Sequence, residues 1–235
     1  MADRTPPTRN VLTRDYIATV ALDLIDRIGL GKFSMRKLGA ELGADPMAAY
    51  RHYADQEDLY DGIAELLFDA LETDALPWDG DWRDLCSAYC ERLRDTLLQH
   101  PHAVTVFASR PVRSPASIAT GNRMIAKLQD ADFTPAEALQ IARCLREFTI
   151  GHALTMAVVA LGAGDRSRKP APADPTYNLL AEAADAEAQS DAEAEADAEA
   201  KAGAARAGAG GHFRLGLQAM LDGFSAGRGR SRGRR

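Results

Sequence analysis

Residues 33–59 constrain the fold more than any other stretch, because they encode two short helices joined by a tight polar turn. Ser34 is placed to cap the first helix by accepting a hydrogen bond from a free backbone N–H. Gly43 then ends that helix, since glycine adopts the left-handed conformation without steric cost. Asp45 and Pro46 begin the second helix as its cap and its first residue. This arrangement is typical of a helix-turn-helix, whose second helix enters a DNA major groove.

An ordinary helical hairpin has the same spacing, so spacing alone leaves both interpretations open. The residues after the turn favour DNA binding, because the run Tyr50, Arg51, His52 and Tyr53 is large and polar-tipped. These residues suit contacts to phosphates and base edges. The helix that carries them is also too short to be stable by itself.

Apolar residues recur at helical spacing along most of the remaining chain, which predicts helices over residues 13–28, 55–71, 81–99 and 117–129. Thr134 to Glu137 form a capping box with proline at the first helical position, and they begin the longest helix, which reaches about Leu161. A last amphipathic helix covers residues 212–226. We therefore expect an all-α chain with an N-terminal head (residues 1–76) and a C-terminal helical domain (residues 77–226).

The net charge of −6 belongs to one segment. Residues 181–211 hold eight acids against Lys201 and Arg206, so the rest of the chain is neutral overall. This alanine-rich and acid-rich insert has nothing large to bury, and we expect it to be mobile and partly helical. The tail, residues 227–235, holds five arginines, and we expect it to be disordered. An arginine-rich tail adds salt-dependent contacts to phosphates, as would Arg4, Arg9 and Arg14 at the other end.

Several function classes find no support in the sequence. No signal peptide or membrane-spanning run is evident, so we expect a cytoplasmic protein with no membrane partner. There is no nucleophile–base pair, phosphate-binding glycine loop or metal cluster, so we expect no enzyme and no cofactor. Cys86 and Cys90 lie one helical turn apart, which suits redox sensing or a metal, although free cysteines are more often small buried hydrophobes.

The stretch resembles the N-terminal signature of the tetracycline-repressor (TetR) family of bacterial transcription regulators. The matching residues are Gly29, Gly31, the run Phe33–Gly39, Leu42, Gly43, Tyr50, His52, Tyr53 and Leu59. Weaker matches to the C-terminal domain of the tetracycline repressors themselves extend over Trp82–Leu85, Leu97, Leu98, His100, Val106, Arg110, Pro111, Phe133, Ala138, Leu139, Phe148–Gly151 and the last helix. The resemblance implies an all-helical homodimer that binds a palindromic operator in double-stranded DNA. The long helix from Pro135 and the final helix would pair with their symmetry mates.

The resemblance also implies which head residues contact DNA. Arg36 would bind a phosphate or a guanine near Ser34, while Tyr50 and His52 would reach phosphates. Base reading would fall to Pro46, Met47, Ala48 and Arg51. Pro46 and Ala48 replace residues that offer hydrogen bonds in the prototype, so we expect a different operator. Arg51 can bind guanine through two hydrogen bonds, and Met47 and Ala48 can face thymine methyl groups.

In the tetracycline repressors a histidine and a nearby carboxylate hold the drug as a magnesium chelate. Phe107 and Thr155 stand at those positions here, and neither side chain suits magnesium. Tyr89 and Met124 replace two polar amides, so we expect no response to tetracycline–magnesium. The predicted effector site comprises Tyr89, Leu93, Phe107, Ser109, Arg110, Met124, Leu139, Glu147 and Thr155. Its mostly apolar composition suits a small organic effector, although the same residues at helical spacing can equally fill a bundle core.

The sequence thus predicts a repressor that a small organic effector, other than tetracycline–magnesium, releases from its operator. The alternative is a constitutive DNA binder of the same family, whose pocket is filled and does not respond to a ligand.

Overall fold

The structure of the chain is a computed structural model that describes residues 12–110, 113–162 and 211–232, with residues 179, 182, 183, 186 and 189 between them. All regular elements in this described part are helices, which confirms the all-α prediction. The chain forms two compact units, Met1–Leu161 and Gly162–Arg235. Within the described residues, no helix is both long enough and apolar enough to cross a membrane.

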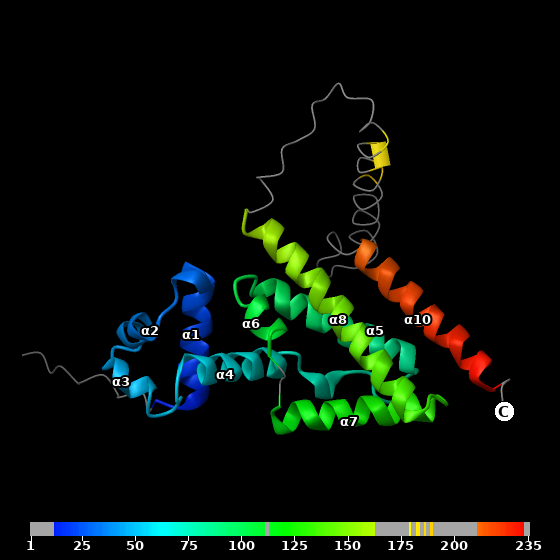
Figure 1. Ribbon diagram of the computed structural model, residues 1–235, viewed down its shortest axis with the longest axis horizontal. Coiled ribbons are helices and arrows are strands. Elements are labelled where there is room, and N and C mark those ends of the chain that lie inside the picture. The colour runs from blue at the N-terminus through cyan, green and yellow to red at the C-terminus, as the bar shows by residue number, and fades with distance from the viewer. Residues whose placement is uncertain are drawn as a thin grey trace, which may run out of the picture. The chain divides into compact units, whose positions relative to one another are not determined.

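The head consists of α1 (Arg14–Ile28), α2 (Met35–Glu41), α3 (Pro46–Ala49) and α4 (Gln56–Asp69), with a short 3-10 turn, η1 (Leu30–Lys32), after α1 (Figure 1). Each α-helix begins at the cap that the sequence predicted. The side chains of Thr13, Ser34, Asp45 and Asp55 accept hydrogen bonds from the backbone of Tyr16, Lys37, Met47 and Asp58. Gly43 has a φ of 60°, the left-handed conformation expected at the end of α2.

The second helix of the helix-turn-helix is only one turn long. It ends at Ala49, so Tyr50, Arg51 and His52 lie beyond the helix in a turn rather than on it. The backbone remains tightly coiled there, because the amides of His52 and Tyr53 both donate to the carbonyl of Ala49, at 3.0 and 3.1 Å. The turn therefore presents these side chains close to where a longer helix would have placed them.

The rest of the first unit is built from α5 (Trp82–Gln99), α6 (Val104–Ala108), α7 (Pro115–Asp130) and α8 (Pro135–Ala160), which follow the short 3-10 turn η2 (Thr73–Ala75). The helix α8 packs against α5, α6 and α7, and α6 also packs against α4 of the head. The helix α7 begins at Pro115, two residues earlier than predicted, because Ser114 caps it and proline is favoured at the first helical position.

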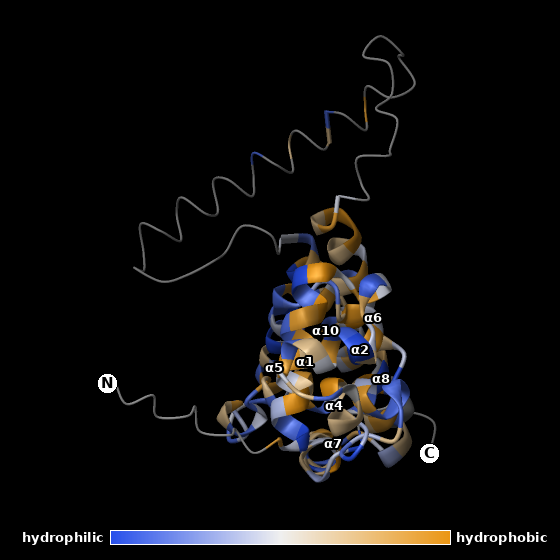
Figure 2. Ribbon diagram, turned by 90° about the vertical axis from the view of Figure 1, so that its left-hand side faces the viewer, coloured by the Kyte–Doolittle hydropathy of each residue, from blue (hydrophilic) through white to orange (hydrophobic). Residues whose placement is uncertain are grey.

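The capping box of α8 is confirmed, since the Thr134 and Glu137 side chains each accept a hydrogen bond from the other's backbone N–H. The last turns of α8 are apolar and partly exposed (Figure 2). Val158, Val159 and Leu161 expose 53%, 57% and 42% of their surface.

The second unit contains α10 (Gly211–Arg232), on which Phe213, Leu217 and Leu221 are buried at a spacing of four residues. The expected disorder of the arginine-rich tail is wrong in part, because α10 continues as far as Arg232 instead of ending near residue 226. Arginine favours helix, which offsets part of the cost of the glycines there. The acidic insert and residues 1–11 lie almost entirely outside the described residues.

Candidate functional site

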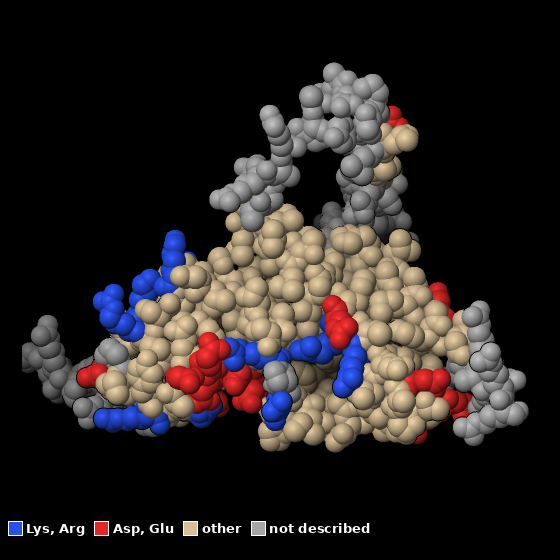
Figure 3. Space-filling model, viewed as in Figure 1, with Lys and Arg blue, Asp and Glu red and all other residues tan. Residues whose placement is uncertain are grey.

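Four of the predicted DNA contacts in the helix-turn-helix have exposed side chains. Met47 exposes 62% of its surface and Tyr50 exposes 40%, and Arg36 and Arg51 are exposed as well. Exposed arginines beside other large side chains suit the mixture of phosphate and base-edge contacts that DNA-binding surfaces make. On the face shown in Figure 3, Lys and Arg side chains gather over α2, which supplies Arg36 and Lys37.

The remaining predicted DNA contacts are less open. Ser34 is half-buried because its hydroxyl caps α2, and Ala48 and His52 are also half-buried. Pro46 is the first residue of α3. The surface that the structure exposes most is therefore formed by Arg36, Met47, Tyr50 and Arg51.

The orientation of this surface is fixed from beneath by Tyr53. Its ring is 2% exposed, and its hydroxyl donates to the carbonyl of Arg14 at 2.9 Å. Burial raises the pKa of Tyr53 to about 12, so the hydroxyl keeps its proton at neutral pH. The ring lies directly against Gly62 of α4, where a Cβ atom would come within 2.5 Å of the hydroxyl oxygen.

Arg14 binds the same turn from α1. Its guanidinium lies 4.1 Å from the Tyr53 ring centre, donates to the carbonyl of His52, and pairs with Asp58 at 3.0 Å. This pairing lowers the pKa of Asp58 and raises that of Arg14. The guanidinium of Arg14 thus binds groups of the head itself, and a contact to phosphate stays a prediction; Arg4 and Arg9 lie outside the described residues.

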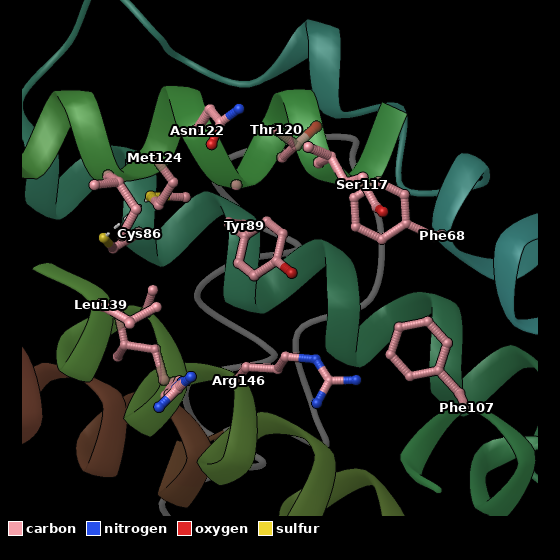
Figure 4. Close-up of a pocket in the computed structure, with 16 residues that line it drawn as sticks. Phe68, Cys86, Tyr89, Phe107, Ser117, Thr120, Asn122, Met124, Leu139 and Arg146 are labelled. Carbon is pink, nitrogen blue, oxygen red and sulfur yellow. Dashed lines mark hydrogen bonds between the residues drawn. The ribbon is translucent and has the colours of Figure 1, made fainter. Parts of the chain in front are cut away.

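A cavity of about 520 Å³ lies between α4, α5, α6, α7 and α8 (Figure 4). This volume falls within the range of about 300–1,000 Å³ that is typical of small-molecule sites. Its walls are mainly apolar and aromatic, with a few polar groups and two arginines. The lining residues are Phe68, Cys86, Tyr89, Phe107, Ser117, Ile118, Thr120, Gly121, Asn122, Met124, Ile125, Leu139, Ala142, Arg143, Leu145 and Arg146.

The structure brings four of the predicted effector residues together in this cavity, namely Tyr89, Phe107, Met124 and Leu139. The other five lie elsewhere. Leu93 is fully buried in the core, and Ser109 donates to the carbonyl of Val106. Glu147 is exposed, and the exposed Thr155 donates to the carbonyl of Gly151.

Arg110 joins the head to the helices of the cavity instead of lining it. Its guanidinium donates to Asp61 at 2.7 Å and pairs with Glu57, and both carboxylates belong to α4. It also lies 5.4 Å from the centre of the Tyr60 ring. A second link is the contact of 2.6 Å between His100, at the end of α5, and Asp26 of α1.

From α7 and α8 the sequence predicted only Met124 and Leu139 of the lining, and it missed the other contributions of both helices. Ser117, Thr120, Gly121 and Met124 form one stripe on α7, at the spacing of a single helix face. Leu139, Arg143 and Arg146 form a similar stripe on α8 at spacings of four and three. This spacing was a usable signal, but it did not show that the faces enclose a cavity.

Cys86 and Cys90 lie inside the protein, whereas Cys144 is exposed. Cys86 lines the cavity beside the sulfur of Met124, at 3.9 Å, and Cys90 is buried. Burial raises the pKa of both thiols, that of Cys90 to about 12, which keeps them protonated and poorly reactive. No cluster of three His, Cys, Asp or Glu side chains suited to a metal occurs among the described residues.

The sequence has relatives among known proteins. Residues 75–227 match the family described as tetracyclin repressor-like, C-terminal domain. An HTH-type transcriptional regulator of Saccharopolyspora erythraea is 32% identical over 146 residues, 61% of this chain and 61% of that protein, so the match spans less than two thirds of the relative. The tetracycline repressor protein class A from transposon 1721 of Escherichia coli is 28% identical over 177 residues, 74% of this chain and 82% of the relative.

The fold is also found in a solved structure. The crystal structure of TetR from Acinetobacter baumannii AYE superposes with a TM-score of 0.70 at 24% identity, and the match covers 93% of this chain and 99% of that one. At this identity the likeness establishes a shared fold. The two named relatives are transcription regulators, which indicates a role other than catalysis.

Proposed function

Because this chain belongs to the tetracycline-repressor (TetR) family, as the match over residues 75–227 shows, we propose that it is a DNA-binding transcriptional repressor. It binds a palindromic operator as a homodimer and leaves it when a small organic effector occupies the cavity. Such a regulator acts in the cytoplasm, where its operator lies.

The observation that carries the proposal is the exposed surface of the helix-turn-helix on a rigid support. Met47 and Tyr50 are exposed although they are large, while Tyr53 is buried and hydrogen-bonded. Arg51 supplies the bidentate donor that reads guanine, and Met47 offers an apolar face to a thymine methyl group. Arg36 and Tyr50 bind phosphates, which positions the head without reading sequence.

Dimerisation is supported by the apolar end of α8. Val158, Val159 and Leu161 are each more than two-fifths exposed. Covering these side chains with the same surface of a second copy would remove this apolar area from water. A two-fold dimer then presents two heads to half-sites that lie about 34 Å apart, or a multiple of this distance.

The cavity supports a ligand-responsive repressor over a constitutive DNA binder, because about 520 Å³ of the C-terminal domain is not filled by its own side chains. Its wall includes Phe68 of α4 and Phe107 of α6, and α4 also carries Asp58, which holds the helix-turn-helix through Arg14. The effector would release the operator if it binds more tightly to a dimer whose head spacing no longer matches the half-sites. Typical couplings of this kind amount to roughly 1–3 kcal/mol.

The lining does not suit a tetracycline–magnesium chelate. It contains no His, Asp or Glu, and the phenyl ring of Phe107 offers a metal no lone pair. Thr155 is not part of the lining, and its hydroxyl is bonded to the carbonyl of Gly151. Magnesium prefers charged oxygen ligands, so the effector is a different organic molecule.

The test is DNA binding by the full chain, measured by fluorescence anisotropy on duplexes that tile the DNA upstream of its own coding sequence. We expect a palindromic duplex to bind at least about a thousandfold more tightly than its scrambled counterpart. Arg51→Ala should weaken palindrome binding by about 1–3 kcal/mol. The matched control Arg113→Ala, an exposed arginine outside the head, should leave binding unchanged. Equal affinity for palindromic and scrambled duplexes contradicts the proposal.

A further inference from the structure

The charges in the lining of the cavity are all of one sign. Arg143 and Arg146 belong to the lining, and no carboxylate does. Tyr89 and Cys86 add no negative charge, since burial raises the pKa of both, that of Tyr89 to about 12. A cavity with fixed positive charge and low-dielectric walls attracts anions and repels cations.

Arg146 lacks the partners that other enclosed arginines have. Arg92 donates to the carbonyls of Leu71, Glu72 and Ala75, Arg94 pairs with Asp95, and Arg110 pairs with Glu57 and Asp61. Arg146 is half-buried, and among the described residues its guanidinium has no hydrogen-bond or ion-pair partner; its ring contact is with Phe107, 5.5 Å from the guanidinium carbon. A guanidinium withdrawn from water is costly unless an acceptor is paired with it.

The groups around Arg146 are aromatic. Figure 4 shows the Arg146 side chain extending along α8 towards Phe107, with the Tyr89 ring in the middle of the cavity. Phe68 forms a further part of the wall, and Met124 lies on the opposite side beside Cys86. Aromatic and thioether groups pack well against flat aromatic rings.

Tyr89 places a second donor close to the same charge. The positive charge of Arg146 acts on the Tyr89 hydroxyl, opposing the rise that burial causes in its pKa. The hydroxyl remains protonated at neutral pH and can donate a hydrogen bond. Among the described residues no hydrogen-bond partner is found for it, so a ligand oxygen between Tyr89 and Arg146 would satisfy both donors.

We propose that the cavity selects planar aromatic anions, which place an acidic group on the Arg146 guanidinium and the Tyr89 hydroxyl and stack their rings against Phe107 and Phe68. The proposal rests on the proposed function, since it names the ligand class of that same cavity. Neutral aromatic molecules of equal size leave Arg146 unpaired, and cations are repelled. The guanidinium, with its planar fork of donors, suits a carboxylate, sulfonate or phenolate.

The test uses two fluorescent probes with the same aromatic rings. Anilinonaphthalene sulfonate carries an anionic group, and N-phenylnaphthylamine lacks it and is neutral. Titrated into the full chain, the sulfonate should bind at least about tenfold more tightly than the neutral probe, as expected for hydrogen bonds to a charged group. Equal affinities, or a preference for the neutral probe, would overturn the proposal.

Variants assign the preference to Arg146. Arg146→Met keeps the apolar stem and removes the charge, so the sulfonate should lose about tenfold in affinity while the neutral probe changes less than about twofold. Arg146→Lys should recover part of the loss, because the charge returns without the fork. Arg113→Gln, a change at an exposed arginine that does not line the cavity, should leave both affinities within about twofold. A sulfonate affinity that survives Arg146→Met contradicts the assignment.

A second pair of variants shows where the probes bind. A Cβ at Gly121 meets no atom within 4 Å, so Gly121→Phe can fill the cavity from α7 with little strain, and Gly121→Ala is the matched control. Gly121→Phe should abolish the binding of both probes, and Gly121→Ala should not. Sulfonate binding that persists in Gly121→Phe places the probe outside the cavity and refutes the proposal.

Operator release separates this inference from the proposed function. If the sulfonate binds in the cavity with the expected preference but does not release operator DNA, the anion site stands and ligand control by such an anion fails. If neutral aromatic molecules bind in the cavity and release the DNA as well as anions do, the repressor function stands and the anion selectivity is refuted.

Discussion

The support beneath the helix-turn-helix makes a sharp prediction at Gly62. This buried glycine lies in the middle of α4, and a Cβ built there would come within 2.5 Å of the Tyr53 hydroxyl oxygen and 2.8 Å of a ring carbon. Ordinary contact begins near 3.4 Å, so the hydroxyl has to withdraw by about 0.9 Å in Gly62→Ala. The hydroxyl donates over 2.9 Å to the carbonyl of Arg14, and a shift of this size breaks the hydrogen bond.

The magnitude follows from three contributions. Overpacking of a buried ring costs about 1–3 kcal/mol, and the lost hydrogen bond costs about 1 kcal/mol. Alanine is favoured over glycine in a helix interior by about 1 kcal/mol, which opposes both. We therefore expect Gly62→Ala to lower the free energy of unfolding by about 1–3 kcal/mol, although an isolated helix would gain from the change.

The control is the same substitution in a helix where the new methyl group has room. At Gly121 of α7 a Cβ meets nothing within 4 Å, so Gly121→Ala should raise the stability by up to about 1 kcal/mol. Urea denaturation of the two variants and the parent, followed by circular dichroism at matched protein concentration, compares the two changes. If Gly62→Ala is as stable as Gly121→Ala, then the Tyr53 ring does not lie as tightly against α4 as the reasoning requires.

Further predictions concern pH, the link between the domains, and the dimer. Burial raises the pKa of Tyr53 from 10.0 to about 12, so the folded state keeps a proton that the unfolded chain gives up. The free energy of unfolding therefore falls as the pH rises from 10.0 to about 12. In Tyr53→Phe, which lacks this hydroxyl, the urea midpoint should fall less over the same pH range. Arg110→Gln removes the ion pairs with Asp61 and Glu57 and should lower the free energy of unfolding by about 1 kcal/mol. The control Arg113→Gln should leave the free energy of unfolding unchanged in the same urea denaturation. Val158→Asp buries a charge in the proposed dimer interface, so sedimentation of the variant should show monomers. If the variant remains dimeric, this end of α8 does not belong to the interface.

The sequence determined the helices and most of their boundaries, because the signals that set them are local. Thr13, Ser34, Asp55 and Thr134 each satisfy a backbone N–H three residues away, so their roles do not depend on the rest of the fold. The start of α7 was placed two residues late, since Pro115 can end a loop as readily as it begins a helix. The pairing of Arg14 could not be predicted in this way, because its partner Asp58 lies 44 residues away.

The tertiary structure alone decided which inward-facing residues surround a cavity. Tyr89 and Leu93 lie on one face of α5, yet Tyr89 lines the cavity and Leu93 is fully buried in the core. Arg110 and Arg146 are both half-buried arginines, yet Arg110 is paired with acids of α4 and Arg146 lines the cavity. Helical periodicity fixes the direction in which a side chain points. Whether it meets another side chain or an open space depends on how helices from distant parts of the sequence pack together, and no local signal encodes that packing.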